Sequence, residues 1–160
     1  MFLNKRYVQA SVAFLRAGRK REAAICDAYL LREKARATPT IANAIKIQAF
    51  AVAAEAFIIC AQECPSKQMK ERLAYYGTAG ECFSEARKLK KAGDSYRMAE
   101  QYAIAARTYR EGECFDDLAD LITQHGSALD SGLLERLTKV TQMHYFKVRS
   151  SKYLIFWISF

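Results

Sequence analysis

The chain has 160 residues, 51% of them apolar, which suits one domain or one stretch of a repeat array with its own core. Only two prolines and seven glycines are present, and the alternation of apolar and polar residues typical of β-strands is almost absent, so we predict an all-α protein. The net charge is +8, with the basic excess in residues 1–64 and 131–160, where it could attract nucleic acid or acidic partners, although solvated helix faces and a basic turn explain it better.

Helical periodicity and helix breakers divide the chain into a series of elements. Helices are expected over about 2–17, ended by Gly18, and over 21–37, ended by Thr38 and Pro39. A third helix, about 39–63, is apolar on most sides, and Pro65 separates it from a fourth that runs to about Ala86. Shorter helices follow over 89–99, 102–111 and 115–125, and a last one over 131–146.

An internal repeat is the most informative feature of the sequence. Three segments align without gaps at a spacing of 13 residues: AGECFSEARKL from Ala79, AGDSYRMAEQY from Ala92 and AARTYREGECF from Ala105. Their fifth positions are Phe83, Tyr96 and Tyr109. Positions one, five and eight share one helical face, so each unit reads as a short helix with an aromatic core residue, followed by a tight turn.

Several consequences of this repeat can be predicted. Connections this short require antiparallel neighbours, which gives stacked helical hairpins in a solenoid. The turns fall at 87–88, 100–101 and 113–114. Gly80 and Gly93 lie inside helices, where close approach of a neighbouring element would compensate for their flexibility. Residues 53–63 fall two periods upstream of the first segment and keep Ala53 and Phe57 in the same register.

The repeat segment, residues 79–122, resembles the tetratricopeptide-like helical repeats of large fungal proteins. These are similar to the TPR and ankyrin repeat-containing proteins, which carry a UvrD/Rep-type helicase module. Residues 24–39 and 133–148 also resemble that group, and the likeness covers about Asn4 to Val148. The resemblance implies a TPR-like α-α superhelix in a single domain over 1–148, as a fragment or paralogue of a larger helicase-associated protein. The apolar tail over 149–160 departs from the pattern, and we expect it to be a truncated or incomplete repeat.

The motifs that would make this segment itself an enzyme are missing. No G-x-x-x-x-G-K-[ST] sequence is present to cradle a phosphate, and the ankyrin signature T-P-L-H is missing as well. Cys60 and Cys64 lie four residues apart and could bind zinc together with His125 or His144, but buried, inert cysteines are the favoured interpretation.

The remaining reactive residues also have a structural explanation. Cys82 takes the repeat position of Ser95 and Thr108, as packing would allow and a catalytic thiol would not need, and neither it nor Cys114 has an evident histidine partner. We therefore predict no catalytic residue, no metal site and no cofactor. An acidic patch is expected to complement the dipole at a helix start; it consists of Asp116, Asp117 and Asp120.

Basic and aromatic residues interleave in a way that single-strand binders also use. One basic group surrounds Gly18 and another lies near residues 88–91; their members are Arg16, Arg19, Lys20, Arg21, Lys88, Lys90 and Lys91. Tyr102 and Tyr109 flank Arg107, but the tyrosines of the repeat have the spacing of core residues, so Tyr96 and Tyr109 are expected inside.

The sequence thus predicts a non-enzymatic helical-repeat scaffold that binds a protein partner or another domain of a larger polypeptide. An alternative is a nucleic-acid-binding accessory segment of a UvrD-type helicase, and a third is a helical enzyme with Cys or His chemistry. Five cysteines, no recognisable signal peptide and no glycosylation sequon indicate an intracellular protein of the cytoplasm or nucleus. No membrane partner is expected, because polar residues interrupt the apolar region 41–61 and a span needs about 20 mostly apolar residues.

Overall fold

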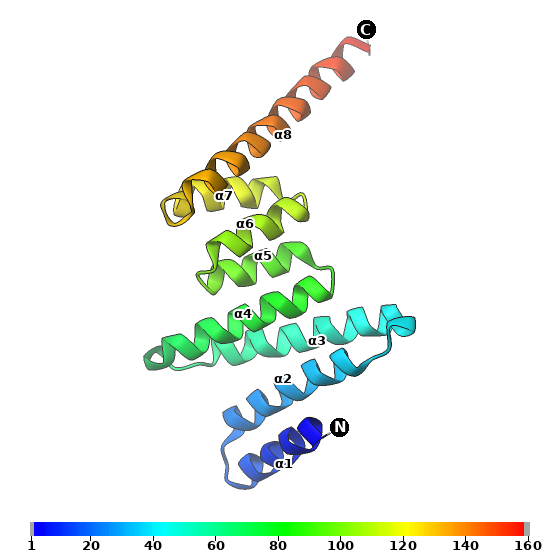
Figure 1. The fold of residues 1–160 in the computed structure, drawn as a ribbon, viewed down its shortest axis with the longest axis vertical. Helices are drawn as coiled ribbons and strands as arrows, with labels where there is room; N and C mark the ends of the chain where they lie inside the picture. The colour runs from blue at the N-terminus through cyan, green and yellow to red at the C-terminus, as the bar shows by residue number, and fades with distance from the viewer. Residues whose placement is uncertain (1, 159–160) are drawn as a thin grey trace.

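The computed structural model describes the backbone of residues 2–158 and the side chains of residues 5–148, and the described backbone is helical without strands (Figure 1). The prediction of an all-α protein is therefore confirmed for these residues. The α-helices are α1 (Phe2–Arg16), α2 (Lys20–Ala37), α3 (Asn43–Gln62), α4 (Met69–Glu85), α5 (Leu89–Met98), α6 (Tyr102–Glu111), α7 (Phe115–His125) and α8 (Ser131–Ile158). Short 3-10 turns cover Thr40–Ala42, Ser66–Gln68 and Gly126–Ala128.

The helices form a single stack in chain order, from α1 at one end to α8 at the other (Figure 1). Each helix runs back against the one before it, and the main packing contacts join consecutive helices, with α6 also touching α8. The predicted antiparallel pairing of neighbours is therefore confirmed. The connections allow no other arrangement, since they are too short to lead the chain back to a parallel start.

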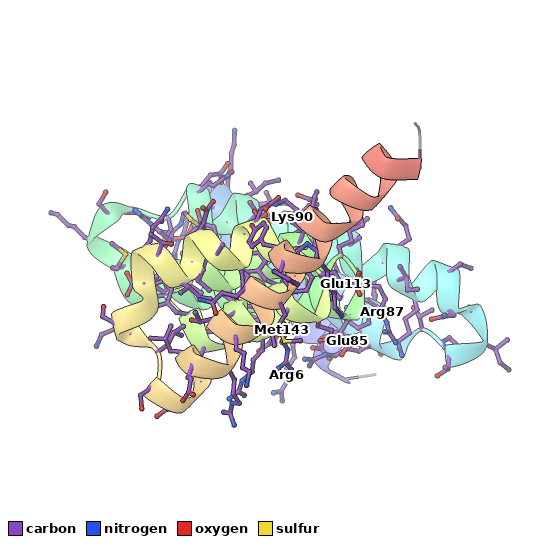
Figure 2. All side chains as sticks on the ribbon, turned by 90° about the horizontal axis from the view of Figure 1, so that it is seen from above. Arg6, Glu85, Arg87, Lys90, Glu113 and Met143 are labelled. Carbon is purple, nitrogen blue, oxygen red and sulfur yellow. The ribbon has the colours of Figure 1, made fainter. Side chains whose placement is uncertain are left out.

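The predicted turns between α4, α5, α6 and α7 have the same left-handed geometry. Arg87, Glu100 and Glu113 have φ angles of 56°, 59° and 54°. At each turn, the following N–H donates to the carbonyl of the repeat aromatic: Lys88 to Phe83 at 2.9 Å, Gln101 to Tyr96 at 2.9 Å, and Cys114 to Tyr109 at 2.8 Å. This hydrogen bond is that of a Schellman motif at the helix C-terminus. Arg87, between α4 and α5, and Glu113, between α6 and α7, lie on the same side of the stack (Figure 2).

The same turn also occurs near the start of the chain, at Gly18, where the sequence predicts the end of the first helix but not its likeness to the repeat. Gly18 has a φ of 73°, and the N–H of Arg19 donates to the carbonyl of Phe14 at 2.8 Å. In the register of the repeat, Phe14 takes the place of Phe83 and Gly18 that of Arg87. Residues 10–20 thus share the aromatic position and the closing turn of the repeat unit, with a glycine where the other copies carry charged residues.

The repeat aromatics lie in the core, as predicted. Phe83, Tyr96 and Tyr109 are 2%, 7% and 0% exposed. Two of these rings pack directly against the backbone of glycines, at Gly80 and Gly93. A Cβ on Gly80 would lie 2.8 Å from the ring of Tyr96, and one on Gly93 would lie 2.4 Å from the ring of Tyr109.

Position two of one unit therefore receives the aromatic of the next unit. The third unit has Ala106 at position two, and 13 residues after Tyr109 the chain carries Ile122 instead of an aromatic residue. Glycine is thus found where the following ring needs room and is replaced where no ring follows. The close approach predicted for these glycines is confirmed, and the approaching group is a side-chain ring.

One expectation about a helix end is wrong, and one likeness to the repeat is incomplete. Residues 53–63 keep side chains of the repeat register but lack its left-handed turn, because α3 continues through Ala61, which is fully buried, and ends only at Gln62. The last helix does not end at 146, because α8 extends to Ile158 and projects beyond the stack (Figure 1). No proline or glycine interrupts residues 133–160, so nothing in the sequence stops that helix. The interpretation of the tail 149–160 as an incomplete repeat concerns side chains that lie outside the described residues.

Helix α3 and the 3-10 turn before it form one segment, Thr40–Gln62, that is long and apolar enough to cross a membrane. Core helices of water-soluble proteins have the same property, and here α2 and α4 cover one side of α3. The buried side includes Phe50, Ala53 and Phe57, while Ile45, Val52 and Ile59 remain exposed on the other. The apolar character of α3 is therefore divided between the core and the surface.

Candidate interaction surface

A cleft of about 320 Å³ with a polar lining lies between α2, α3 and α4. We call it the charged cleft. Its lining comes from three helices and consists of Arg32, Arg36, Lys46, Phe50, Glu81, Cys82 and Glu85. Sequence reasoning missed this site, because these residues are brought together only by the packing of α2 and α4 around α3.

The walls of the charged cleft carry opposite charges. Arg32 and Arg36 are one helical turn apart on α2, and Glu81 and Glu85 are one turn apart on α4. Lys46 adds a third cation from α3. Among the described residues, no ion pair joins either glutamate to these cations. Each wall therefore keeps a charge that a bound segment could meet.

Arg32 is held in place by aromatic rings beneath it. Its guanidinium lies 5.0 Å from the ring centre of Tyr29 and 5.9 Å from that of Phe57. Cation–π contacts of this kind fix the long side chain against the core. Its Nε atom is 3.4 Å from a carboxylate oxygen of Glu33, which also lies 3.3 Å from Arg36, yet that buried Nε makes no hydrogen bond.

The floor of the charged cleft is apolar, and its one thiol is unreactive. Phe50 and Cys82 are 4% and 1% exposed. Burial raises the pKa of the Cys82 thiol to about 11, with nearby Arg32 opposing that rise. A thiol with this pKa is protonated at neutral pH and is a poor nucleophile. The cleft is thus suited to holding a ligand by charge and contact.

The other cysteines lie in equally unreactive surroundings. Cys60 is buried, and burial raises the pKa of its thiol to about 11. Burial also raises the pKa values of Cys26 and Cys114, which are partly exposed. Cys64 follows the end of α3 and receives a hydrogen bond from Arg21 at 3.3 Å.

The histidines that the zinc alternative would need do not lie beside Cys60 and Cys64. His125 is at the end of α7, where its ring stacks on Tyr102 at 4.2 Å between centres. His144 is on α8 and stacks on Phe115 at 4.0 Å. Both helices lie beyond α4, α5 and α6 in the stack (Figure 1). In the described part of the chain, no group of three or more Cys, His, Asp or Glu residues could hold a metal ion.

The acidic patch lies in the first turn of α7, as expected, but its side chains bind other helices. Asp116 and Asp117 occupy that turn, and the residue that caps the helix, Cys114, makes no side-chain capping bond. Asp117 pairs with Lys90 of α5, and Asp116 accepts a hydrogen bond from Tyr145 of α8. The patch therefore ties neighbouring helices together as well as complementing the dipole of α7.

Part of the basic charge is also paired with carboxylates within the stack. Arg19 pairs with Glu22 at 2.7 Å, Arg21 with Glu71 at 3.6 Å, and Lys91 with Glu55 at 2.6 Å. Tyr109 is fully buried and donates a hydrogen bond to Asp94 at 2.7 Å, so it cannot stack on a nucleic-acid base. The structure thus supports the core interpretation of the repeat tyrosines.

Comparison with known proteins gives no match: no family model, no curated protein and no solved structure corresponds to this chain. The likeness to helicase-associated repeats is therefore unsupported by these comparisons. The geometry of the charged cleft and of the exposed helix faces is what any functional proposal must rest on.

Proposed function

We propose that the chain is a non-enzymatic, TPR-like helical-repeat scaffold that binds a segment of another protein or of another domain in a larger polypeptide. The charged cleft is the contact site in this proposal. The observation that carries it is the pair of oppositely charged walls, Arg32 and Arg36 facing Glu81 and Glu85, with no ion pair between them in the described part of the chain. A short segment with both an acidic and a basic residue fits this arrangement.

The energetics of such a site favour a peptide over a small reactive substrate. Charged walls contribute selectivity and association rate, while contact with Phe50 on the floor contributes apolar burial. The supporting helices are rigid and the Arg32 side chain is already fixed, which lowers the entropy lost on binding. The partly exposed charges remain screened by salt, so binding should weaken at high ionic strength.

Charge reversal provides the test. A peptide-display selection on the full chain should enrich segments that pair an acidic with a basic residue. Arg36→Glu should weaken the selected peptide by about tenfold or more, as should Glu85→Arg. Arg87→Glu is the matched control, because Arg87 lies on the α4–α5 turn outside the cleft and Glu100 and Glu113 already occupy the equivalent turns. Equal loss in Arg36→Glu and Arg87→Glu with a gain in Glu85→Arg would reduce the effect to net charge. Either that result or an equal loss in all three variants would contradict the proposal.

Nucleic-acid binding is the second candidate function. It is favoured by exposed cations on α1, namely Lys5, Arg6 and Arg16, which make no ion pair with other described residues. Affinity for single-stranded DNA or RNA that falls steeply with salt would support this candidate. If no complex forms at low salt, the protein-binding proposal is favoured.

A connection to a UvrD/Rep-type helicase stays a proposal that rests on the sequence resemblance alone. Co-purification of the chain with such a helicase, and loss of the complex in Arg36→Glu but not in Arg87→Glu, would join that proposal to the charged cleft. Retention of the complex in both variants would place the contact elsewhere.

A further inference from the structure

Helix α3 exposes a row of large apolar side chains on the side away from the core. Ile45, Val52 and Ile59 are 66%, 45% and 51% exposed. They are spaced seven residues apart, so they lie in one line along the helix. We call this row the α3 stripe. It is separate from the charged cleft, to which α3 contributes Lys46 and Phe50.

The surface beside the α3 stripe has the form that receives a side chain from a second helix. A groove of about 470 Å³ is lined by Ile45, Gln48, Ala49 and Val52, together with Ala44. The first four are residues i, i+3, i+4 and i+7, the four-residue hole into which a neighbouring helix inserts a knob. One heptad further along, Val52, Glu55, Ala56 and Ile59 repeat the same spacing. The small residues Ala49 and Ala56 leave room for close approach.

The α3 stripe is also symmetric along the helix. Ile45 precedes Val52 by seven residues and Ile59 follows it by seven. A two-fold interface must place a surface against itself, so that each residue meets its counterpart about the axis. An antiparallel pair of α3 helices centred on Val52 does this, with Val52 on the axis and Ile45 opposite Ile59 of the second copy.

The charge at the middle of the surface favours the antiparallel direction. Glu55 is exposed beside the stripe and pairs with Lys91 of α5 at 2.6 Å. In the antiparallel register, Glu55 lies opposite Ala49 of the second copy, and its pairing with Lys91 is kept. In a parallel register, Glu55 would face Glu55 of the second copy, and like charges would repel. We propose that the chain self-associates through the α3 stripe as an antiparallel two-fold dimer.

A lipid bilayer is the competing occupant, since the segment Thr40–Gln62 is long and apolar enough to span one. Insertion would require α3 to leave its contacts with α2 and α4, where Phe57 and Ala53 are fully buried. It would also place Glu55 within the hydrocarbon, where a carboxylate is costly. A second copy covers the stripe without either change, so it is the occupant we propose.

The register is tested by single cysteine substitutions under mild oxidation. Val52→Cys should cross-link to itself, because the two-fold axis passes through it. Ile45→Cys alone should not, since its counterpart would be roughly 21 Å away by helical rise. A mixture of Ile45→Cys and Ile59→Cys should cross-link to each other. The chain with only its native cysteines and the surface variant Ile104→Cys serve as controls for chance collision.

The association itself is tested by the mass in solution of the full chain. The wild-type chain should have about twice the single-chain mass of 18.1 kDa, and Val52→Glu should reduce it to that of one chain. Ile104→Glu is the matched control, because Ile104 is also 45% exposed, and it should remain dimeric. Circular dichroism spectra of the folded variants should be alike, since both replace exposed side chains, while Val52→Glu should melt lower because it lacks the stabilisation that association gives.

Several outcomes would overturn this proposal. A wild-type chain that remains single at all accessible concentrations excludes the dimer. A Val52→Glu variant that stays dimeric moves the interface to another surface. Self-cross-linking of Ile45→Cys excludes the register. Binding of the single chain to neutral phosphatidylcholine vesicles, lost in Val52→Glu but not in Ile104→Glu, would identify the occupant as lipid.

Discussion

The ring of Tyr109 lies directly on the backbone of Gly93, so close that a Cβ there would be 2.4 Å from the ring edge. The same relationship joins Tyr96 to Gly80 at 2.8 Å. In both cases, the aromatic ring of one short helix packs against the backbone of a glycine in the helix before it. The 13-residue repeat places each aromatic residue where it makes this contact with the preceding unit.

Adding a methyl group at Gly93 should disrupt that contact. Gly93→Ala is expected to lower the free energy of unfolding by about 1–3 kcal/mol, because the ring must move within a filled core. The matched change Gly77→Ala meets only the flexible amide of Gln101 at 3.0 Å and should be near neutral or stabilising. Urea unfolding followed by circular dichroism measures both. Less than additive loss in the double variant Gly93→Ala with Tyr109→Leu would confirm that the ring is the obstacle.

Removing the repeat aromatics should cost more. Phe83 and Tyr109 are 2% and 0% exposed, so Phe83→Ala and Tyr109→Ala should each lower the free energy of unfolding by about 3–5 kcal/mol. The exposed Phe146 on α8, which is 74% exposed, is the control and should be nearly neutral when replaced by alanine. If either core change proved neutral in a thermal melt, the repeat interpretation would be wrong.

Glycine should raise the free energy of unfolding when it is placed at a left-handed turn, whereas within a helix it should lower it. Arg87 has a φ of 56°, where an L-residue is strained, so Arg87→Gly should stabilise the chain by about 0.5–1 kcal/mol. Arg107→Gly removes the same side chain from an exposed position within α6 and should destabilise by a similar amount. Equilibrium unfolding of the two variants gives the comparison. Destabilisation by both would mean that the side chain of Arg87 matters more than its backbone.

The pH dependence of stability should reveal the buried phenol of Tyr109. Burial and then the hydrogen bond to Asp94 raise its pKa in the folded chain above the ordinary value of 10.0. A folded state that holds its proton more tightly is fully favoured below pH 10 and loses that advantage as the pH rises towards the folded pKa. Tyr109→Phe should therefore be less stable than the wild type at neutral pH, with a difference that shrinks above pH 10. A constant difference across this range would contradict the assignment.

Thiol reactivity should follow burial. With a disulfide reagent at mildly alkaline pH, the partly exposed Cys26 and Cys114 should react before Cys60 and Cys82, whose pKa values are about 11. All five should react alike in denaturant. A native thiol that reacted faster than free cysteine would revive the hypothesis of a helical enzyme with cysteine chemistry.

The sequence predicted most of the helices because their ends depend on local signals. Gly18, Pro39 and Pro65 mark breaks that any reader of the chain can see, and the 13-residue spacing placed the turns after α4, α5 and α6. The end of α8 was missed because the change in composition near Phe146 is not a helix breaker. Residues 53–63 matched the repeat by side chain, but α3 continues through the position of the repeat's left-handed turn.

The two candidate surfaces could not be predicted in the same way. The charged cleft requires Arg36 of α2 and Glu85 of α4 to line the same concavity, and this depends on how three helices pack. The α3 stripe was visible in the sequence only as general apolarity of the third helix. Deciding which of its side chains face the core required the positions of α2 and α4, since Val52 and Ala53 differ by one residue and lie on opposite sides.

The order of the stack also has a kinetic consequence. Because the main contacts join helices that are adjacent in the chain, hardly any of them requires distant segments to find one another. Chains dominated by such local contacts fold rapidly and can begin at more than one place. Opening should likewise start at the outermost helices and advance inward, so amide hydrogens of α4 and α5 should exchange with solvent last.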